Sequence, residues 1–161
     1  NTVFLPQLLM SADAAKEAFE RIKQNLAKKG IQEEKKGTII LATVKGDIHD
    51  IGKNIVKVLL ENYGFDVLDL GKDVPPEIIV QTAIEKNVRL VGLSALMTTT
   101  VESMAETIRQ LRKAHDCKVM VGGAVLTEEY ARTIYADAYC RDAMASVNYA
   151  ERVFAGIKGE I

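Results

Sequence analysis

The sequence predicts an α/β protein built on a doubly wound, five-stranded parallel sheet. From residue 38 onward, short apolar runs alternate with helical patterns. The runs are nearly continuous in apolar residues, as is typical of parallel strands buried on both faces. Five strand–helix units follow one another, which favours a flavodoxin-like (Rossmann-like) sheet with strand order 2-1-3-4-5.

The N-terminal part predicts one helix and a linker. Apolar residues recur at alternating spacings of four and three over residues 5–28, a pattern typical of a single helical stripe. The polar, glycine-bounded stretch at 29–37 predicts a linker before an α/β domain at 38–161. Because the chain begins with Asn1 and not Met, we expect it to be a piece of a longer protein.

Within the α/β part, strands and helices are predicted in strict alternation. The predicted strands are 38–44, 65–70, 90–94, 118–122 and a weak fifth at 136–140. Two helices show one apolar face each, formed by Ile51, Ile55, Val58 and Leu59 in the first and by Met104, Ile108 and Leu111 in the second. Further helices are expected to begin near Pro76, Thr127 and Ala143.

Composition excludes several classes of protein. Of 161 residues, 48% are hydrophobic and 27% are charged, as in an ordinary globular domain, and the net charge of −1 does not favour nucleic acid or an anionic membrane. No apolar run approaches the roughly 20 residues of a spanning helix. Cys117 and Cys140 are too few for a disulfide framework or a cysteine zinc site, so we expect buried or half-buried free thiols and a cytoplasmic protein.

The motif residues gather where such a sheet binds its ligands. The site of a doubly wound sheet lies beyond the carboxyl ends of the strands, where the strand order reverses. Here that position falls between the first and third strands. The segment "KGDIHDIGKN" (45–54) follows the first strand, "SALMTTT" (94–100) follows the third, and Gly122-Gly123 ends the fourth.

His49 lies between two aspartates in this region, and several interpretations apply. It is a plain polar loop residue if Asp47 and Asp50 serve only a turn or a helix cap. The glycine spacing does not match a nucleotide-binding motif, no second zinc ligand stands at ligand spacing, and no nucleophile elbow is present. A lone histidine suffices as an axial ligand when a macrocycle already holds the metal, and Asp47 is placed to accept its other ring N–H.

These residues resemble those of a known family. Asp47-x-His49-x-x-Gly52, Ser94-x-Leu96 and Gly122-Gly123 are similar to the motif set of domains that bind cobalamin (vitamin B12) with its lower base displaced. The stretch "ATVKGDIHDIGKNIV" resembles cobalamin-dependent methionine synthase and the corrinoid proteins of methyltransferase systems. The resemblance covers essentially the whole chain. It implies that residues 1–28 are the last helix of a helical cap domain.

The resemblance implies a role for each matching residue. His49 would be the lower axial cobalt ligand, Asp47 would accept its N–H, and Thr100, where the family often has serine, would continue that chain. The resemblance also implies three groups of cofactor contacts: Ser94, Leu96 and Thr98 around the nucleotide tail, Gly52, Gly122 and Gly123 leaving room for it, and Gly46, Asp50, Ile51 and Ala143 near the cofactor. Leu5 and Leu8 would cover the upper face of the corrin.

By the same resemblance, the chain is the cobalamin-carrying module of a methyltransferase and not an enzyme by itself. Its cofactor would be methylcobalamin. Its partners would be methyl-donor and methyl-acceptor domains or subunits, such as those for methyltetrahydrofolate and homocysteine in a methionine-synthase-like protein, and a reductive activation partner. The alternatives are the small subunit of a corrinoid mutase, a cobalamin-sensing regulatory module and a flavodoxin-like domain without cofactor.

Overall fold

The computed structural model describes residue 21 and residues 35–156, and the chain divides into two compact units, Asn1–Glu34 and Lys35–Ile161. The fold described below belongs to the second unit. The helix expected over residues 5–28, and the upper-face cover expected from Leu5 and Leu8, lie outside the described residues. These expectations and the domain boundaries at 28 and 37 stay predictions.

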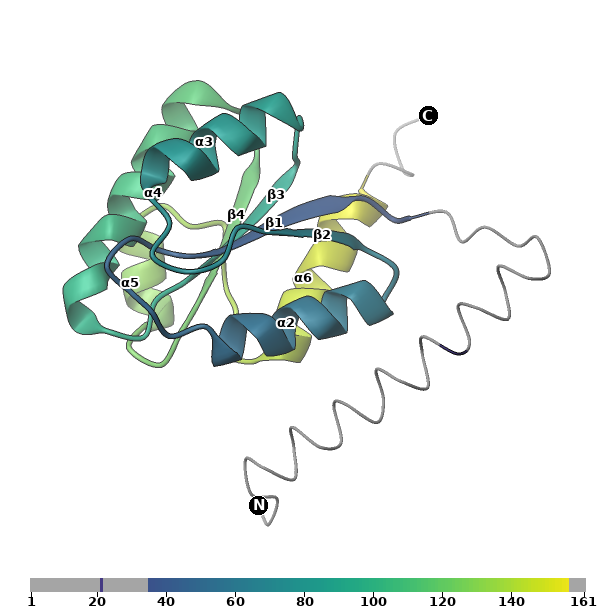
Figure 1. Ribbon diagram of the computed structural model, residues 1–161, viewed down its shortest axis with the longest axis horizontal. Coiled ribbons are helices and arrows are strands. Elements are labelled where there is room, and N and C mark those ends of the chain that lie inside the picture. The colour runs from purple at the N-terminus through teal and green to yellow at the C-terminus, as the bar shows by residue number, and fades with distance from the viewer. Residues whose placement is uncertain (1–20, 22–34, 157–161) are drawn as a thin grey trace, which may run out of the picture. The chain divides into compact units, whose positions relative to one another are not determined.

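The described fold is one parallel sheet with helices on both faces (Figure 1). Its strands are β1 (Thr38–Thr43), β2 (Asp66–Asp69), β3 (Leu90–Ser94), β4 (Lys118–Gly122) and β5 (Ala138–Tyr139). The strand order is β2-β1-β3-β4-β5, with every neighbouring pair parallel. The predicted fold class and strand order are confirmed, and the weak fifth strand shortens to two residues.

The helices are α2 (Ile51–Asn62), α3 (Pro76–Glu85), α4 (Val101–Ala114), α5 (Glu128–Thr133) and α6 (Ala143–Ala155), with a 3₁₀ turn, η1 (Thr98–Thr100), before α4. Helices α2 and α6 cover one face of the sheet, and α3, α4 and α5 cover the other (Figure 1). The side chain of Thr127 caps α5 by accepting the Tyr130 amide at 3.1 Å, and that of Asp142 caps α6 by accepting the Ala145 amide at 2.7 Å. These caps explain why the helices begin at the predicted places.

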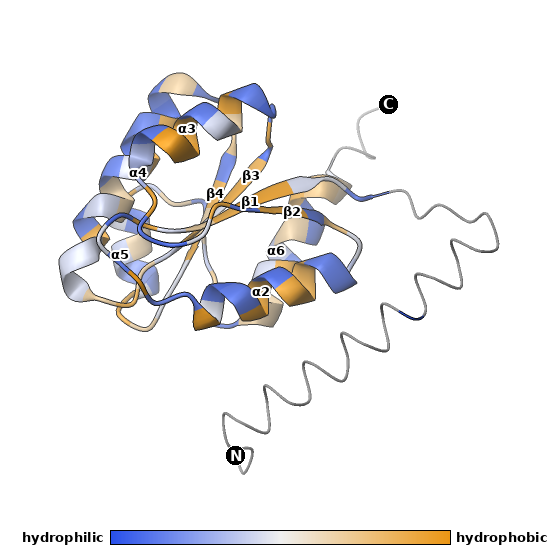
Figure 2. Cartoon of the chain, viewed as in Figure 1, coloured by the Kyte–Doolittle hydropathy of each residue, from blue (hydrophilic) through white to orange (hydrophobic). Residues whose placement is uncertain are grey.

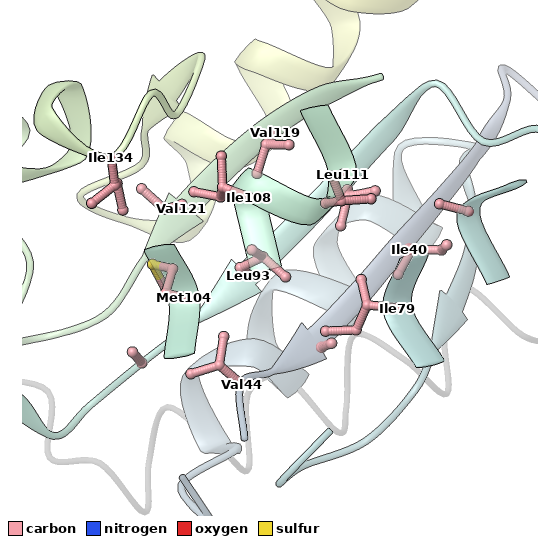
Figure 3. Packing of buried hydrophobic residues seen from close by; sticks show 14 of the residues in the cluster. Ile40, Val44, Ile79, Leu93, Met104, Ile108, Leu111, Val119, Val121 and Ile134 are labelled. Carbon is pink, nitrogen blue, oxygen red and sulfur yellow. The ribbon is translucent and has the colours of Figure 1, made fainter. Parts of the chain in front are cut away.

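Successive strand residues contribute to two separate hydrophobic cores, one on each face of the sheet, because side chains in a strand alternate between the two faces. Ile40 and Val44 of the β1 segment pack with α3 and α4, whereas Ile39 and Leu41 pack with α2 and α6. Figure 3 shows the first of these cores, with strand side chains meeting Ile79 of α3 and the Met104, Ile108 and Leu111 stripe of α4. Strands buried on both faces account for the nearly continuous apolar runs in the sequence.

The predicted apolar face of α2 is only partly the face that packs on the sheet. The side chain of Ile51 is 56% exposed, whereas the buried residues of α2 are Leu60 and, unexpectedly, Lys53. Lys53 takes an inward position because its ammonium meets the Asp69 carboxylate of β2 at 2.6 Å. Figure 2 shows hydrophobic and hydrophilic residues side by side on the visible surface of α2. Helical periodicity predicted the helix correctly but misassigned Ile51.

No helix among the described residues is long and apolar enough to cross a membrane.

Candidate functional site

The predicted site segments meet at one edge of the sheet because the strands that precede them end in register. Thr43 of β1 pairs with Ser94 of β3, which pairs with Gly122 of β4. Two further backbone hydrogen bonds carry this pairing beyond the strands, from the Val44 amide to the Ser94 carbonyl and from the Ala95 amide to the Gly122 carbonyl, each at 3.1 Å. The loops after β1, β3 and β4 therefore begin side by side.

The centre of this edge is the carboxylate of Asp47, which is fully buried. Its Oδ1 accepts the amide of His49 at 3.0 Å and lies 2.8 Å from the ring Nδ1 of the same residue. Its Oδ2 accepts the amides of Leu96 at 2.6 Å and Met97 at 3.1 Å. The Thr100 hydroxyl lies 3.0 Å from Oδ2 and 2.8 Å from the Met97 carbonyl, so its single proton serves one of them at a time.

These contacts keep Asp47 ionised. Burial by itself would raise the pKa of the Asp47 carboxyl. Hydrogen bonds from the amide and ring of His49, from the Leu96 amide and from the nearby hydroxyl outweigh burial and hold this pKa well below its usual range. A buried carboxylate with so many donors also joins the loop after β1 to the loop after β3, and this fixes the position of both.

An ionised Asp47 determines the tautomer of His49. A carboxylate only accepts hydrogen bonds, so the proton of the neutral imidazole must lie on Nδ1. The lone pair is then on Nε2, to which no described residue hydrogen bonds. The His49 side chain is 47% exposed, so the ring combines a fixed orientation with an accessible lone pair. This arrangement suits coordination of a metal from outside the protein.

Large apolar side chains are exposed near His49 in the chain and in the loop after β3. Ile48 is 63% exposed, Ile51 is 56% exposed, and Leu96 and Met97 are each 40% exposed. A single exposed apolar side chain is ordinary, but three in the two loops joined by Asp47, and Ile51 at the start of α2, make this end of the sheet a candidate for binding an apolar ligand. Ile51 was expected to face the core, and its exposure is explained if its side chain is part of this apolar surface.

The glycines of the predicted tail pocket differ in what they do for the fold. A Cβ on Gly52 would meet nothing within 4 Å, so Gly52 leaves open space at the start of α2. A Cβ on Gly122 would lie 3.2 Å from the Cys140 carbonyl oxygen. A Cβ on Gly123 would lie 1.7 Å from the Ala95 carbonyl oxygen, and the φ of Gly123 is +139°. Gly123 is therefore required by the fold itself, whatever ligand binds nearby.

The remaining predicted residues lie in or next to the loops after β1 and β3, except for Ala143, which follows β5. Ser94, at the end of β3, and Ala143, at the start of α6, are half-buried. Thr98 in η1 and Gly46 before Asp47 are exposed. Asp50 occupies the N-cap position of α2, but its side chain makes no capping hydrogen bond. Their expected contacts with a cofactor stay predictions.

Two further residues of the site were not found from the sequence. The Met97 amide contacts Asp47, and Asp73 in the loop after β2 accepts the Gly46 amide at 2.7 Å. Met97 acts here through its backbone, which no side-chain pattern reveals. Asp73 lies in "GKDVP", which is indistinguishable from an ordinary turn before a helix.

The described residues contain no cluster of side chains that could hold a metal ion without a cofactor. Within residues 35–156, no three His, Cys, Asp or Glu side chains lie close enough to hold a metal ion. Both cysteines are free and buried, as predicted. Burial raises the pKa of the Cys117 thiol to about 11 and also raises that of Cys140.

We expect the folded state to lose stability in acid. Burial would raise the pKa of the Asp47, Asp69 and Asp137 carboxyls, but hydrogen bonds, including those from Lys53 to Asp69 and from Arg112 to Asp137, lower all three. Carboxyls with a lowered pKa in the folded state stabilise it above about pH 4, the pKa of unfolded aspartate, and this contribution is lost as the pH falls further.

The urea midpoint of the cofactor-free protein should therefore stay nearly constant between about pH 5 and 7 and fall steadily below about pH 4. A midpoint that stays constant down to about pH 3 would contradict these three assignments.

Comparisons with known proteins show the family of this chain. Residues 37–157 match the family model of the B12 binding domain. Dimethylamine corrinoid protein 1 of Methanosarcina acetivorans is 42% identical over 156 residues, which are 95% of this chain and 73% of the relative. Trimethylamine corrinoid protein 1 of Methanosarcina mazei is 43% identical over 141 residues, which are 86% of this chain and 65% of the relative.

Solved structures show the same fold. A cobalamin-binding protein from Desulfitobacterium hafniense superposes with a TM-score of 0.76 at 35% identity, covering 94% of this chain and 71% of that one. The methanol:cobalamin methyltransferase complex from Methanosarcina barkeri gives a TM-score of 0.75 at 31% identity, covering 96% of this chain and 59% of that one. The chain belongs to the B12-binding domain family and carries a cobalamin-binding domain of the type found in the corrinoid proteins of methyltransferase systems.

Proposed function

We propose that this protein holds cobalamin with His49, in place of the cofactor's own nucleotide base, as the lower axial ligand. In this role it carries a methyl group between the partner proteins of a methyltransferase system. One observation supports the ligand assignment above the others. The buried, ionised Asp47 holds Nδ1 of His49 at 2.8 Å, which leaves the Nε2 lone pair on a ring that is 47% exposed.

The surroundings of His49 fit a corrin. Four partly exposed apolar side chains, Ile48, Ile51, Leu96 and Met97, provide a surface for a large macrocycle, and the space beside Gly52 is open. Bound cobalamin supplies a cobalt centre that accepts and releases methyl groups. The protein's own residues orient the ligand. Asp47 sets the tautomer and direction of the imidazole, and the Leu96 and Met97 amides together with the Thr100 hydroxyl keep Asp47 ionised.

We infer that the methyl donor is a methylated amine, used by a separate methyltransferase subunit. The names of the relatives support this inference, since dimethylamine and trimethylamine corrinoid proteins are 42% and 43% identical to this chain. The methanol:cobalamin complex is a more distant likeness, at 31% identity. The methyltetrahydrofolate–homocysteine pair, the reductive activation partner and the mutase and sensor alternatives stay untested predictions.

The test begins with stoichiometry. The chain is mixed with hydroxocobalamin and separated from excess cofactor by gel filtration, and the visible absorbance of the protein peak is measured. We expect one equivalent of cobalamin per chain. A colourless protein peak would contradict the proposal.

The donor is tested on the loaded, chemically reduced protein. Methyltransferases specific for dimethylamine, trimethylamine and methanol are added separately, each with its substrate, and the absorbance change on methylation is followed. We expect methylation with an amine-specific enzyme and much slower methylation with the methanol enzyme. Methylation by the methanol enzyme alone would overturn the donor class while leaving the carrier function intact.

A further inference from the structure

The loop between β2 and α3 pairs with the end of β1, next to the loop that carries His49. The Gly71 carbonyl accepts the amide of Thr43, the last residue of β1, at 2.9 Å. The Val74 amide donates to the Thr43 carbonyl at 3.1 Å, and Val74 forms a parallel bridge with Val44. The segment 71–74 thus continues the pairing of the sheet past the end of β1, beside the residues that lead to His49.

Asp73 makes two contacts from this segment to the backbone of the His49 loop. Its Oδ1 accepts the Gly46 amide at 2.7 Å, and its own amide donates to the Asp47 carbonyl at 2.9 Å. Asp73 therefore binds both the peptide group that precedes Gly46 and the peptide group that follows Asp47. The backbone of Asp47 makes one other hydrogen bond, from its amide to the Val44 carbonyl at 3.0 Å.

The backbone conformation of Asp73 is unusual. Its φ is +54°, in the left-handed region, where residues other than glycine are uncommon and aspartate and asparagine are the best tolerated. Gly46, its partner, also has a positive φ, of +85°. These two residues with positive φ are joined by a short hydrogen bond. This indicates that the backbone conformation here is held by the contact between them.

We propose that Asp73 is a positioning residue for the axial histidine: through the Gly46–Asp47 backbone it directs the Asp47 carboxylate toward Nδ1 of His49. This proposal rests on the proposed function, in which His49 is the ligand. The Asp47 carboxylate contacts the amide and the half-exposed ring of His49, the amides of the Leu96–Met97 loop and the buried Thr100 hydroxyl, all of which lie in the loops after β1 and β3. The Asp73 hydrogen bonds join Asp47 instead to a segment paired with the end of β1.

The effect of Asp73 on the His49 ring can be separated from any effect on the stability of the folded protein. Gly46 and Asp73 are both exposed, so water can replace the lost partner of the Gly46 amide when the Asp73 side chain is removed. We therefore expect a local effect on the His49 ring with little change in the urea midpoint. A residue needed only for folding would show the opposite pattern.

Three variants separate the side chain of Asp73 from its backbone. D73N keeps an acceptor oxygen and tolerates the positive φ. D73G tolerates the positive φ but has no acceptor. N87G is the matched control, because Asn87 is another non-glycine residue with a positive φ, of +46°, in the turn between α3 and β3 at the opposite edge of the sheet.

The first measurement uses the full, cofactor-free chain. Exchange of the His49 Nδ1 proton with water is followed by proton–nitrogen NMR. D73G should speed this exchange about two- to tenfold, the effect of losing one ordinary hydrogen bond, while D73N and N87G stay close to the original protein. Unchanged exchange in D73G, or equal acceleration in N87G, would overturn the proposal. If D73G unfolds at the assay temperature, D73E, which displaces the carboxylate by one methylene, takes its place.

The second measurement separates this proposal from the proposed function. Each variant is loaded with cobalt(II) cobinamide, which lacks the nucleotide base, and nitrogen hyperfine coupling is recorded by electron paramagnetic resonance. We expect the coupling in the original protein and D73N and a smaller coupled fraction in D73G. No coupling even in the original protein would refute His49 ligation itself. Equal coupling in the original protein and D73G would refute only the role of Asp73.

Discussion

Replacement of Gly123 with alanine is expected to destabilise the folded protein by about 3–5 kcal/mol, a large part of the stability of a domain this size. The new Cβ would lie 1.7 Å from the Ala95 carbonyl oxygen and 2.7 Å from its carbonyl carbon. Both atoms belong to the backbone where β3 ends, so no flexible side chain can move aside. The φ of +139° at Gly123 adds strain for any residue with a Cβ. Urea unfolding of the cofactor-free protein measures the loss.

Gly52→Ala is the matched control for this substitution. Its Cβ would enter open space in the first turn of α2, where alanine favours the helix more than glycine does. We expect a urea midpoint equal to or slightly above that of the original protein, together with weaker cobalamin binding if the cofactor occupies that space. A Gly123→Ala protein as stable as Gly52→Ala would show that the ends of β3 and β4 adapt freely.

Asp47→Asn is expected to remove the axial ligand although His49 itself is unchanged. An asparagine has one acceptor oxygen, whereas Asp47 uses both of its oxygens as acceptors. If the amide oxygen keeps the Leu96 and Met97 amides, the NH₂ group faces His49 and donates to Nδ1. The ring proton then lies on Nε2, and no lone pair remains there for a metal.

The same substitution should also reduce the stability of the folded protein. The new NH₂ group would face the His49 amide, so two buried N–H donors would point at each other with no acceptor between them. We expect a cost of about 1–3 kcal/mol. Nitrogen NMR of the His49 ring in the cofactor-free protein reads the tautomer, and urea unfolding reads the stability.

Asp142→Asn serves as the control for Asp47→Asn, since Asp142 caps α6 and asparagine caps a helix about equally well. If the Asp47→Asn protein keeps its ring proton on Nδ1, then Asp47 does not set the tautomer.

Much of the fold was predictable because a doubly wound sheet leaves strong local signals. Strands buried on both faces must be apolar throughout, so β3 and β4 were predicted with their observed bounds. Thr127 and Asp142 mark helix starts because their side chains satisfy free amides. The predicted topology also placed the loops after β1, β3 and β4 side by side, since the carboxyl ends of parallel strands meet at one edge.

The rest depended on tertiary contacts that leave no periodic signal. Lys53 is buried in α2 while Ile51 is exposed, and apolar periodicity could not predict this because the ion pair with Asp69 is what allows a lysine to point inward. The contact of Asp73 with Gly46 joins a carboxylate to a backbone amide 27 positions away. Gly123 was expected to make room for a cofactor tail, but the structural demand on it comes from the backbone of Ala95, just after β3, which leaves no space for a Cβ.

The most direct measurement of His49 ligation is the electron paramagnetic resonance spectrum of the protein loaded with cobalt(II) cobinamide. Cobinamide has no nucleotide base of its own, so a coupled nitrogen must come from the protein. Of the two histidines, His49 presents an open Nε2, whereas the Nε2 of His115 lies 2.8 Å from the Val88 carbonyl oxygen. The original protein and the His115→Ala control should both show coupling to one nitrogen, and His49→Ala should lose it. Coupling that persists in His49→Ala would show that another group binds the cobalt.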